Sequence, residues 1–188
     1  NLQKNAFTGA IPPSLGLMYK LEILNFEYNQ LTGDIPAAIT TMIKLRQLVL
    51  RYNNLSGVIP ERMENLLDLE VLYIDHNQLT GPIPKRFGYL YKCRRINLSN
   101  NRLSGGLPES LNEKDLAIVK ECNLSNNNLS GELSAGFVSM ILHTRAQGIK
   151  TFDLTGNNKG FTLPKGIATL KMGVPLAGTS AISDGAAI

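Results

Sequence analysis

Apolar residues recur along the chain in groups of three, and an asparagine follows each group three residues later. In the segment LRQLVLRYN, residues 45–53, leucines occupy the first, fourth and sixth positions. The alternation around Leu48 and Leu50 predicts a short strand in which these two side chains point inward and Val49 and Arg51 point outward. A strand this short leaves one apolar side that its own repeat cannot bury.

The same group repeats in register through most of the chain. One such unit needs neighbours stacked on both sides, so the pattern predicts a curved solenoid in which the strands pair as a parallel sheet on the concave face. The apolar groups are Leu21/Leu24/Phe26, Leu45/Leu48/Leu50, Leu69/Leu72/Ile74, Cys93/Ile96/Leu98, Val119/Cys122/Leu124 and Ile149/Phe152/Leu154. The asparagines that follow, together with the one that precedes the first group, are Asn5, Asn29, Asn53, Asn77, Asn101, Asn127 and Asn157.

Each asparagine stands where the strand turns away, and its amide can donate to and accept from backbone groups of adjacent turns. A regularly spaced Gly then permits a tight bend, and a Pro suits a turn or a short helical start. Beyond each Pro a second apolar set is expected to fill the core from the convex side. Its members are Leu15/Met18, Ile39/Met42, Met63/Leu66 and Phe87/Leu90.

The repeat divides the chain into two parts. Residues 1–164 are expected to form the solenoid, with about seven registers, of which the first is partial and the last two are irregular. Within the irregular part, residues 137–147 are expected to form a short convex helix. Residues 165–188 are rich in small side chains and carry no further strand signature, which favours an extended or poorly ordered tail.

The longer phrase NQLTGDIPAAITTMIKLRQLVLRYN resembles the plant-type leucine-rich repeat, L-x-x-L-x-x-L-x-L-x-x-N-x-L-[ST]-G-x-I-P. This subtype occurs in receptor-like kinases, receptor-like proteins and polygalacturonase-inhibiting proteins. The resemblance covers roughly residues 1–164. It implies an α/β solenoid, a right-handed leucine-rich-repeat superhelix with a parallel β-sheet on the concave face and short 3-10, helical or irregular convex segments. It also implies a second short strand around the T-G-x-I segment, and partner binding on the concave and lateral faces.

Side chains that point out of the sheet change from repeat to repeat, and those of repeats 2–4 gather aromatic residues beside an arginine. Exposed aromatics with an arginine on a rigid surface have the composition of a binding hot spot. We therefore expect a protein or peptide partner on the concave face. The predicted contact residues are Glu27, Tyr28, Val49, Arg51, Tyr52, Val71, Tyr73, Asp75, His76 and Arg95.

Two alternatives remain open from the residues alone. Glu27, Arg51 and Asp75 can instead form a charge ladder across neighbouring strands, with the tyrosines in ordinary cross-strand stacking. The whole chain can also serve as an architectural accessory subunit of a large multiprotein assembly, held by neighbouring chains rather than by capping domains. A third class, ice or polysaccharide binding, requires a flat and regular Ser/Thr array, and the row Ser99/Ser125/Thr155 is too short for one.

Composition and charge exclude several function classes. The net charge of +4 and the distribution of basic residues around the coil, including those of KRFGYLYKCRR at 85–95, do not predict a nucleic-acid partner. No apolar run is long enough to span a membrane. His76 and His143 are the only histidines, and neither adjoins a Ser or Cys in a nucleophile arrangement. No phosphate loop or metal-ligand spacing occurs, so we expect no enzyme activity, metal or cofactor.

The two cysteines and four glycosylation sequons point to different compartments. Cys93 and Cys122 occupy inward positions at different levels of adjacent strands, roughly 11 Å apart and beyond disulfide reach. They are expected to be free buried thiols, which favours a reducing compartment. The family resemblance and the sequons at Asn54, Asn97, Asn123 and Asn128 favour a secreted one, although the repeat itself generates the sequence NLS.

Overall fold

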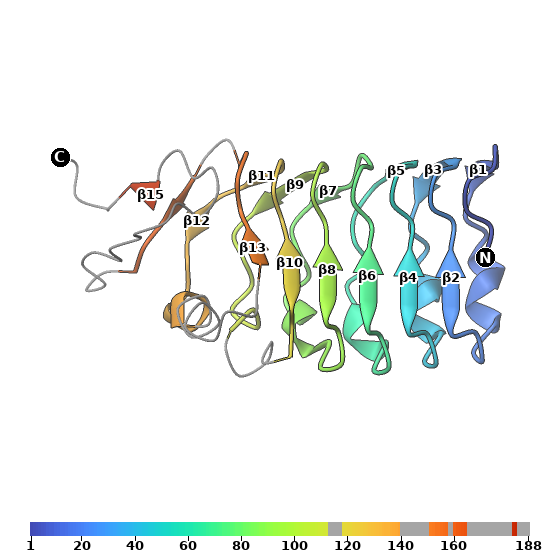
Figure 1. Cartoon of the computed structure of the whole chain (residues 1–188), viewed down its shortest axis with the longest axis horizontal. Coiled ribbons are helices and arrows are strands. Elements are labelled where there is room, and N and C mark those ends of the chain that lie inside the picture. The colour runs from blue at the N-terminus through green and yellow to red at the C-terminus, as the bar shows by residue number, and fades with distance from the viewer. Residues whose placement is uncertain (113–117, 140–150, 158–159, 165–181, 184–188) are drawn as a thin grey trace.

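The computed structural model describes residues 1–112, 118–139, 151–157, 160–164 and 182–183. Six short strands pair in parallel into one sheet in the order β13-β10-β8-β6-β4-β2, as Figure 1 shows. Each repeat contributes one strand, so neighbours in the sheet are consecutive repeats. The strands are β2 (Ile23–Asn25), β4 (Gln47–Val49), β6 (Val71–Tyr73), β8 (Arg95–Asn97), β10 (Glu121–Asn123) and β13 (Thr151–Asp153).

A second set of strands follows the main-sheet position in the repeats and forms three further small sheets. Their orders are β1-β3-β5, β11-β9-β7 and β12-β14-β15. The strands are β1 (Thr8–Ala10), β3 (Gln30–Asp34), β5 (Asn54–Ser56), β7 (Thr80–Gly81), β9 (Arg102–Gly105), β11 (Asn128–Leu129), β12 (Gly131–Glu132), β14 (Phe161–Thr162) and β15 (Ile182–Ser183).

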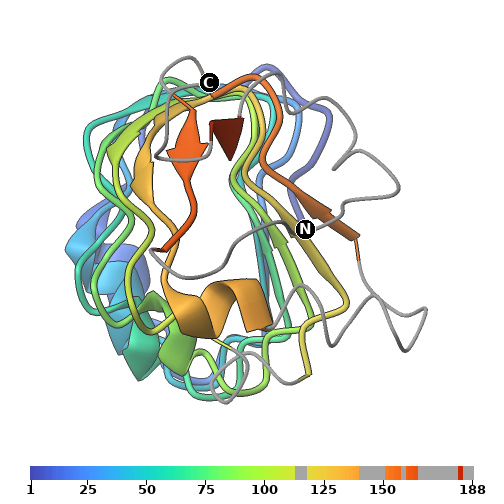
Figure 2. The ribbon, with the colours of Figure 1, turned by 90° about the vertical axis from the view of Figure 1, so that its left-hand side faces the viewer.

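The convex side carries short helices, which the end-on view of Figure 2 places across the coil from the main sheet. Four are 3-10 helices: η1 (Pro13–Leu17), η2 (Ala37–Thr41), η3 (Met63–Asn65) and η4 (Phe87–Tyr89). Residues 135–139 are α-helical, and residues 140–147 of the expected convex helix lie outside the described residues. The architecture is the leucine-rich-repeat solenoid that the sequence predicts.

The core lies between the main sheet and the convex helices. Inward side chains of successive strands lie in register, with Leu24 opposite Leu48 and Leu48 opposite Leu72. The convex set closes the core from the other side, and Ile39, Met63 and Phe87 are at most 1% exposed. Met18 differs from the expectation, being 50% exposed, because its repeat is the first and has a neighbour on one side only.

A ladder of asparagine side chains joins each repeat to the next. The amide nitrogen of Asn53 donates to the carbonyls of Phe26 and Leu50 at 2.9 and 3.0 Å, and its oxygen accepts the N–H of Leu31 at 3.0 Å. Asn29, Asn77, Asn101, Asn127 and Asn157 repeat this arrangement. Backbone groups left unpaired where the strands turn away thereby find partners in the interior.

The convex segments approach one another closely at Gly88 of η4. A Cβ atom at this position would overlap the carbonyl oxygen of Ser110 in the next repeat. The hydroxyl of Ser110 accepts the Gly88 N–H at 3.0 Å and donates to the Lys85 carbonyl at 2.8 Å. Absence of a side chain at Gly88 is therefore what allows this backbone contact.

The C-terminal tail remains a prediction. Residues 165–181 and 184–188 lie outside the described residues, and β15 alone represents the tail, paired in parallel with β14. Among the helices of the described part, none has the length and apolar character needed to cross a membrane.

Candidate functional site: the concave face of repeats 2–4

Three rings stack in a column at the end of successive strands of the main sheet. The ring centroids of Tyr28 and Tyr52 are 4.4 Å apart with planes 9° apart, and those of Tyr52 and His76 are 4.1 Å apart with planes 19° apart. These three residues, called here the aromatic column, each directly precede a ladder asparagine after β2, β4 or β6. Their spacing follows from the separation of paired strands, about 4.8 Å.

The backbone under the aromatic column is left-handed. Tyr28, Tyr52 and His76 have φ of 54°, 57° and 52°, and Asn100 and Asn126 have φ of 53° at the equivalent position in later repeats. Asparagine tolerates this region because its short amide can bond locally, whereas a bulky side chain there is unusual. The two tyrosines therefore oppose a local backbone preference that the later repeats satisfy, which is typical of functional positions.

Arg51 lies beside the column and is held on three sides. Its Nη2 donates to Glu27 Oε1 at 3.0 Å, and its guanidinium carbon lies 5.3 Å from the Tyr73 ring centroid and 6.0 Å from that of Tyr52. Burial opposes the charged form, but the hydrogen bond and charge of Glu27 outweigh it and raise the pKa of Arg51. The Nε of Arg51 is buried without a hydrogen-bond partner in the described part of the chain.

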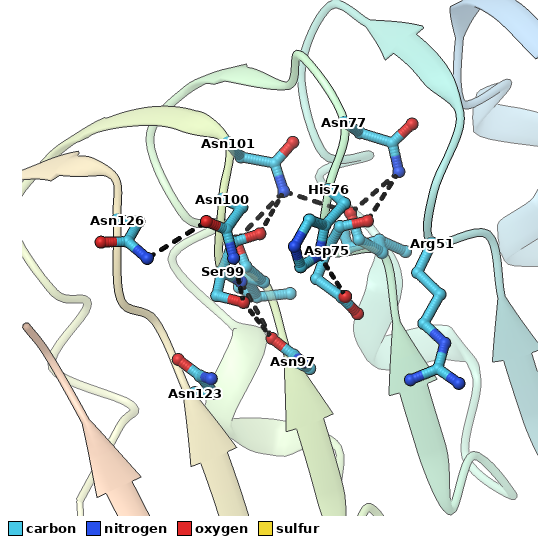
Figure 3. Close-up of polar contacts among 12 residues, drawn as sticks. Arg51, Asp75, His76, Asn77, Asn97, Ser99, Asn100, Asn101, Asn123 and Asn126 are labelled. Atoms are coloured by element: carbon cyan, nitrogen blue, oxygen red, sulfur yellow. Dashed lines mark hydrogen bonds and ion pairs between the residues drawn. The ribbon is translucent and has the colours of Figure 1, made fainter. Parts of the chain in front are cut away.

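Asp75 is a buried carboxylate rather than a surface charge. Its residue is 2% exposed, and Oδ2 lies 2.8 Å from Nδ1 of His76 (Figure 3). Loss of hydration raises the pKa of Asp75, and the contact with His76 partly offsets that rise. Because Asp75 pairs with His76 and Arg51 with Glu27, the described residues contain no Arg51–Asp75 ion pair. The continuous charge ladder considered from the sequence is thus interrupted.

Beyond His76 the concave face changes from aromatic to amide and hydroxyl groups that bond to one another. Asn97 Oδ1 accepts from the N–H and hydroxyl of Ser99 at 3.0 and 2.7 Å. Asn123 and Ser125 repeat these contacts, and Asn126 Nδ2 donates to Asn100 Oδ1 at 3.1 Å (Figure 3).

The four sequons consequently differ in accessibility. The side chains of Asn97 and Asn123 bond to the serine of their own sequon, whereas Asn54 is exposed and Asn128 is half-buried. Glycosylation at any of the four stays a prediction.

The ten predicted contact residues occupy one surface but differ in exposure. Tyr28 and Arg95 are exposed; Arg51, Tyr52, Val71, Tyr73 and His76 are half-buried; Glu27, Val49 and Asp75 are buried. Val49 is 6% exposed although it points out of the sheet between Asn25 and Tyr73. Their contact with a partner stays a prediction. Sequence reasoning missed Glu121, whose Oε2 accepts a hydrogen bond from the Tyr73 hydroxyl at 3.4 Å.

The cysteines are remote from this surface chemistry. Cys93 and Cys122 are buried and unbonded to each other, as the inward positions predict. Burial raises the pKa of each thiol to about 12. Within the described residues no group of three His, Cys, Asp or Glu side chains is placed to hold a metal ion.

Comparison with protein families finds leucine-rich-repeat sequences across much of the chain. A family profile described as leucine rich repeat matches residues 43–103, and a second profile of the same description matches residues 20–42 and 119–140. Together the matches cover more than half of the chain. Among curated protein sequences none matches at a significant level.

Several solved plant proteins share the fold. The Arabidopsis thaliana receptor kinase HAESA, in complex with the peptide hormone IDA and the co-receptor SERK1, is 33% identical over 84% of this chain and 25% of its own, with a TM-score of 0.73. The Arabidopsis BIR3–SERK2 complex gives 37% identity over 59% of this chain and 60% of its own, with a TM-score of 0.56.

A plant ice-binding protein is also similar, at 27% identity over 82% of this chain and 46% of its own, with a TM-score of 0.65. The chain spans 18–30% of the length of the receptor ectodomains that it matches.

Proposed function

Because the chain belongs to the leucine-rich-repeat family, with repeats of the plant type, we propose that it binds a protein or peptide partner through the concave face of repeats 2–4. The aromatic column supports this proposal most directly. Two tyrosines occupy left-handed positions where two later repeats use asparagine, and they stack with His76 beside Arg51. A folding role alone does not require them, since Asn100 and Asn126 serve the same turn.

The surroundings of the column also favour recognition of a partner. Arg51 is positioned by Glu27 and two rings before any partner arrives, so binding would order few additional side chains. Aromatic and arginine side chains on a rigid surface are the residue types that dominate binding energy at interfaces. Structurally similar proteins were solved with a peptide hormone and the co-receptor SERK1, and as a complex of BIR3 with SERK2, which is consistent with a peptide or protein ligand here.

The experiment replaces Tyr28 and Tyr52 together by asparagine, the residue that later repeats carry at this position. The substitution removes two stacked pairs, which costs about 0.5–1.5 kcal/mol for each pair. Relief of the left-handed strain at the two tyrosines returns a similar amount, about 1–2 kcal/mol for each residue. We therefore expect the melting temperature to stay within a few degrees of the wild-type value, with the change confined to binding.

Binding is measured with peptides selected on the immobilised chain from a random display library, using calorimetry for each peptide. Peptides that use the concave face should bind the double variant at least about tenfold more weakly, a loss of about 1.4 kcal/mol. Tyr89→Asn is the matched control, because Tyr89 is 37% exposed and lies in the convex helix η4, off the concave face. Equal affinity of the selected peptides for the double variant would contradict the proposal.

A further inference from the structure

An exposed apolar stripe runs along the edge of the solenoid where each 3-10 helix leads into the next strand of the main sheet, in the loops below β2, β4, β6 and β8 in Figure 1. It consists of Tyr19, Ile43, Leu67 and Tyr91, which are 58%, 50%, 60% and 55% exposed. The four residues are 24 positions apart, so they occupy the same place in four consecutive repeats.

Folding alone does not account for the apolar stripe. The preceding residues Met42, Leu66 and Leu90 are at most 1% exposed and already supply the core at this level. Ile43 and Leu67 lie in repeats that have neighbours on both sides, so their exposure is not a property of the first repeat. An apolar row that remains exposed in the folded chain is typical of an interaction surface.

A row of alternating charges borders the apolar stripe on its strand side: Glu22, Arg46, Glu70 and Arg94. Arg46 contacts both acidic neighbours, with Nη2 2.8 Å from Glu70 Oε1 and Nη1 3.7 Å from Glu22 Oε2. The outer two members of the charge row form fewer close ion pairs than Arg46 does. The Glu22 side chain is 63% exposed, and Arg94 forms no ion pair within the described residues.

Reversing the apolar stripe leaves its order unchanged, whereas reversing the charge row exchanges acidic for basic at every position. The apolar stripe has the order tyrosine, aliphatic, aliphatic, tyrosine, and the charge row has the order acidic, basic, acidic, basic. Laid antiparallel on a second copy of itself, the stripe places Tyr19 opposite Tyr91 and Ile43 opposite Leu67. The same rotation places Glu22 opposite Arg94 and Arg46 opposite Glu70, so every charge in this row meets one of opposite sign.

We propose that two copies of this chain associate through their apolar stripes, related by a two-fold axis that crosses the stripe between Ile43 and Leu67. A two-fold contact uses the same patch on both copies and must be self-complementary, which is what the apolar stripe and the charge row provide. It also closes at the dimer and leaves the concave face of each copy free. This surface is separate from the partner site proposed above.

A third row lies between the apolar stripe and the charge row and consists of Lys20, Lys44, Asp68 and Lys92. Its charges neither favour nor oppose the two-fold arrangement. Lys44 would meet Asp68 and Lys20 would meet Lys92, giving equal numbers of favourable and unfavourable encounters. Asp68 is already paired within the chain, with Lys92 Nζ at 2.7 Å and Lys44 Nζ at 3.6 Å. Lys120, which continues the charge row, would lie beyond Glu22 of the second copy.

The size of the surface indicates a weak dimer. Four repeats at a strand spacing of about 4.8 Å make a stripe about 14 Å long. Such a contact lies at the low end of specific interfaces, below about 1,200 Å² of total buried area. We therefore expect a dissociation constant in the micromolar range, about 10–100 μM, and a monomer in dilute solution.

The first arm of the experiment is sedimentation equilibrium of the whole chain between about 5 and 500 μM, a range chosen to span the expected dissociation constant. A monomer–dimer equilibrium is expected for the wild type. Ile43→Gln combined with Leu67→Gln should weaken it at least about tenfold. The control is Val58→Gln, because Val58 is 52% exposed but lies outside the stripe. A wild type that stays monomeric, an open-ended polymer, or a dimer insensitive to the stripe variant would each overturn the proposal.

The second arm tests the two-fold pairing by charge reversal. Arg46→Glu alone and Glu70→Arg alone each place like charges opposite one another, so each variant should be monomeric over the same range. An equimolar mixture of the two should associate, because the new acidic side chain of one variant then meets the new basic side chain of the other, while the unchanged Glu70 meets the unchanged Arg46. Circular dichroism of each variant verifies folding. If the mixture associates no better than either variant alone, the antiparallel arrangement is wrong.

Discussion

At the scale of single residues, the ladder asparagines and the column tyrosines illustrate opposite relations to the backbone. Asn77 bonds to backbone groups of two coils, donating to the carbonyls of Leu50 and Ile74, which it shares with Asn53 and Asn101, and accepting from the N–H of Leu55. Tyr52 satisfies none and occupies a conformation that its side chain disfavours. The first kind of residue maintains the coil, and the second is available for recognition.

Asn77→Ala is expected to be among the most damaging single substitutions in the chain. It removes the acceptor of the buried Leu55 N–H, at about 1–3 kcal/mol, and one of two hydrogen bonds at each of the Leu50 and Ile74 carbonyls, at about 0.5–1.5 kcal/mol each. The free energy of unfolding should therefore fall by about 2–6 kcal/mol. Urea denaturation followed by circular dichroism measures the change. Asn54→Ala is the control, since Asn54 is exposed and has no left-handed backbone that alanine would strain. A loss below about 1 kcal/mol for Asn77→Ala would refute the role assigned to the ladder.

At the scale of elements, strands and convex helices are joined to the next repeat in different ways. The strands share one register from β2 to β13, whereas convex contacts depend on local side chains. The Ser110 carbonyl packs directly against Gly88 of η4, and the Ala38 carbonyl packs likewise against Gly16 of η1. Thr40 and Glu64 occupy the equivalent positions in η2 and η3. The convex side is therefore the part of the repeat that tolerates irregularity.

Gly88→Ala tests this convex contact. The added Cβ overlaps the Ser110 carbonyl oxygen, and relief requires η4 to move away from the next repeat. We expect the free energy of unfolding to fall by about 1–3 kcal/mol, as for an overpacked core position. Gly106→Ala is a suitable comparison, because the nearest heavy atom to its added Cβ is the Ser130 carbonyl oxygen at 3.6 Å. Equal stability of the two variants would show that the close approach is dispensable.

The periodicity of the sequence predicts which side chains point inward, but the exposed fraction of each side chain also depends on the conformations of side chains on the adjacent strands. Leu48 and Leu50 are fully buried as expected. Val49 points outward yet is buried between Asn25 and Tyr73, and Asp75 pairs with His76 instead of joining the charge ladder that the sequence left open as an alternative. Such outcomes require side-chain conformations across two strands, which the repeat pattern does not encode. The apolar stripe follows the 24-residue period and was detectable as one apolar residue per repeat.

At the scale of the whole molecule, the core continues through every described repeat without a break. Buried side chains from Ile11 to Phe161 pack into one cluster, and Cys93 and Cys122 lie within it. A solenoid of this kind is stabilised by each repeat and by the interfaces between neighbours. Because both thiols are buried in consecutive repeats, they become accessible to solvent only when the middle of the solenoid opens.

Stability should decrease at high pH because of these thiols. Burial raises the pKa of each to about 12 from 9.0, so the folded chain holds protons that the unfolded chain releases. Their contribution is fully present below about pH 9 and is lost as the pH rises from about 9 towards about 12. Urea denaturation across this range measures the effect, and Cys93→Ala with Cys122→Ala should flatten the decline. A decline unchanged by the double substitution would assign it to other groups.

The asparagine ladder gives the repeats of Asn29 to Asn127 the same pair of connections, one to the coil before and one to the coil after. A segment of one full repeat, such as residues 45–68, contains the asparagine that bonds to the preceding coil and the backbone groups that bond to the next asparagine. Its two ends occupy equivalent positions in consecutive coils. In-frame duplication or deletion of such a segment in the gene would therefore lengthen or shorten the molecule by one unit without requiring new joints. Recognition surfaces can be rearranged by moving whole cassettes of 24 residues.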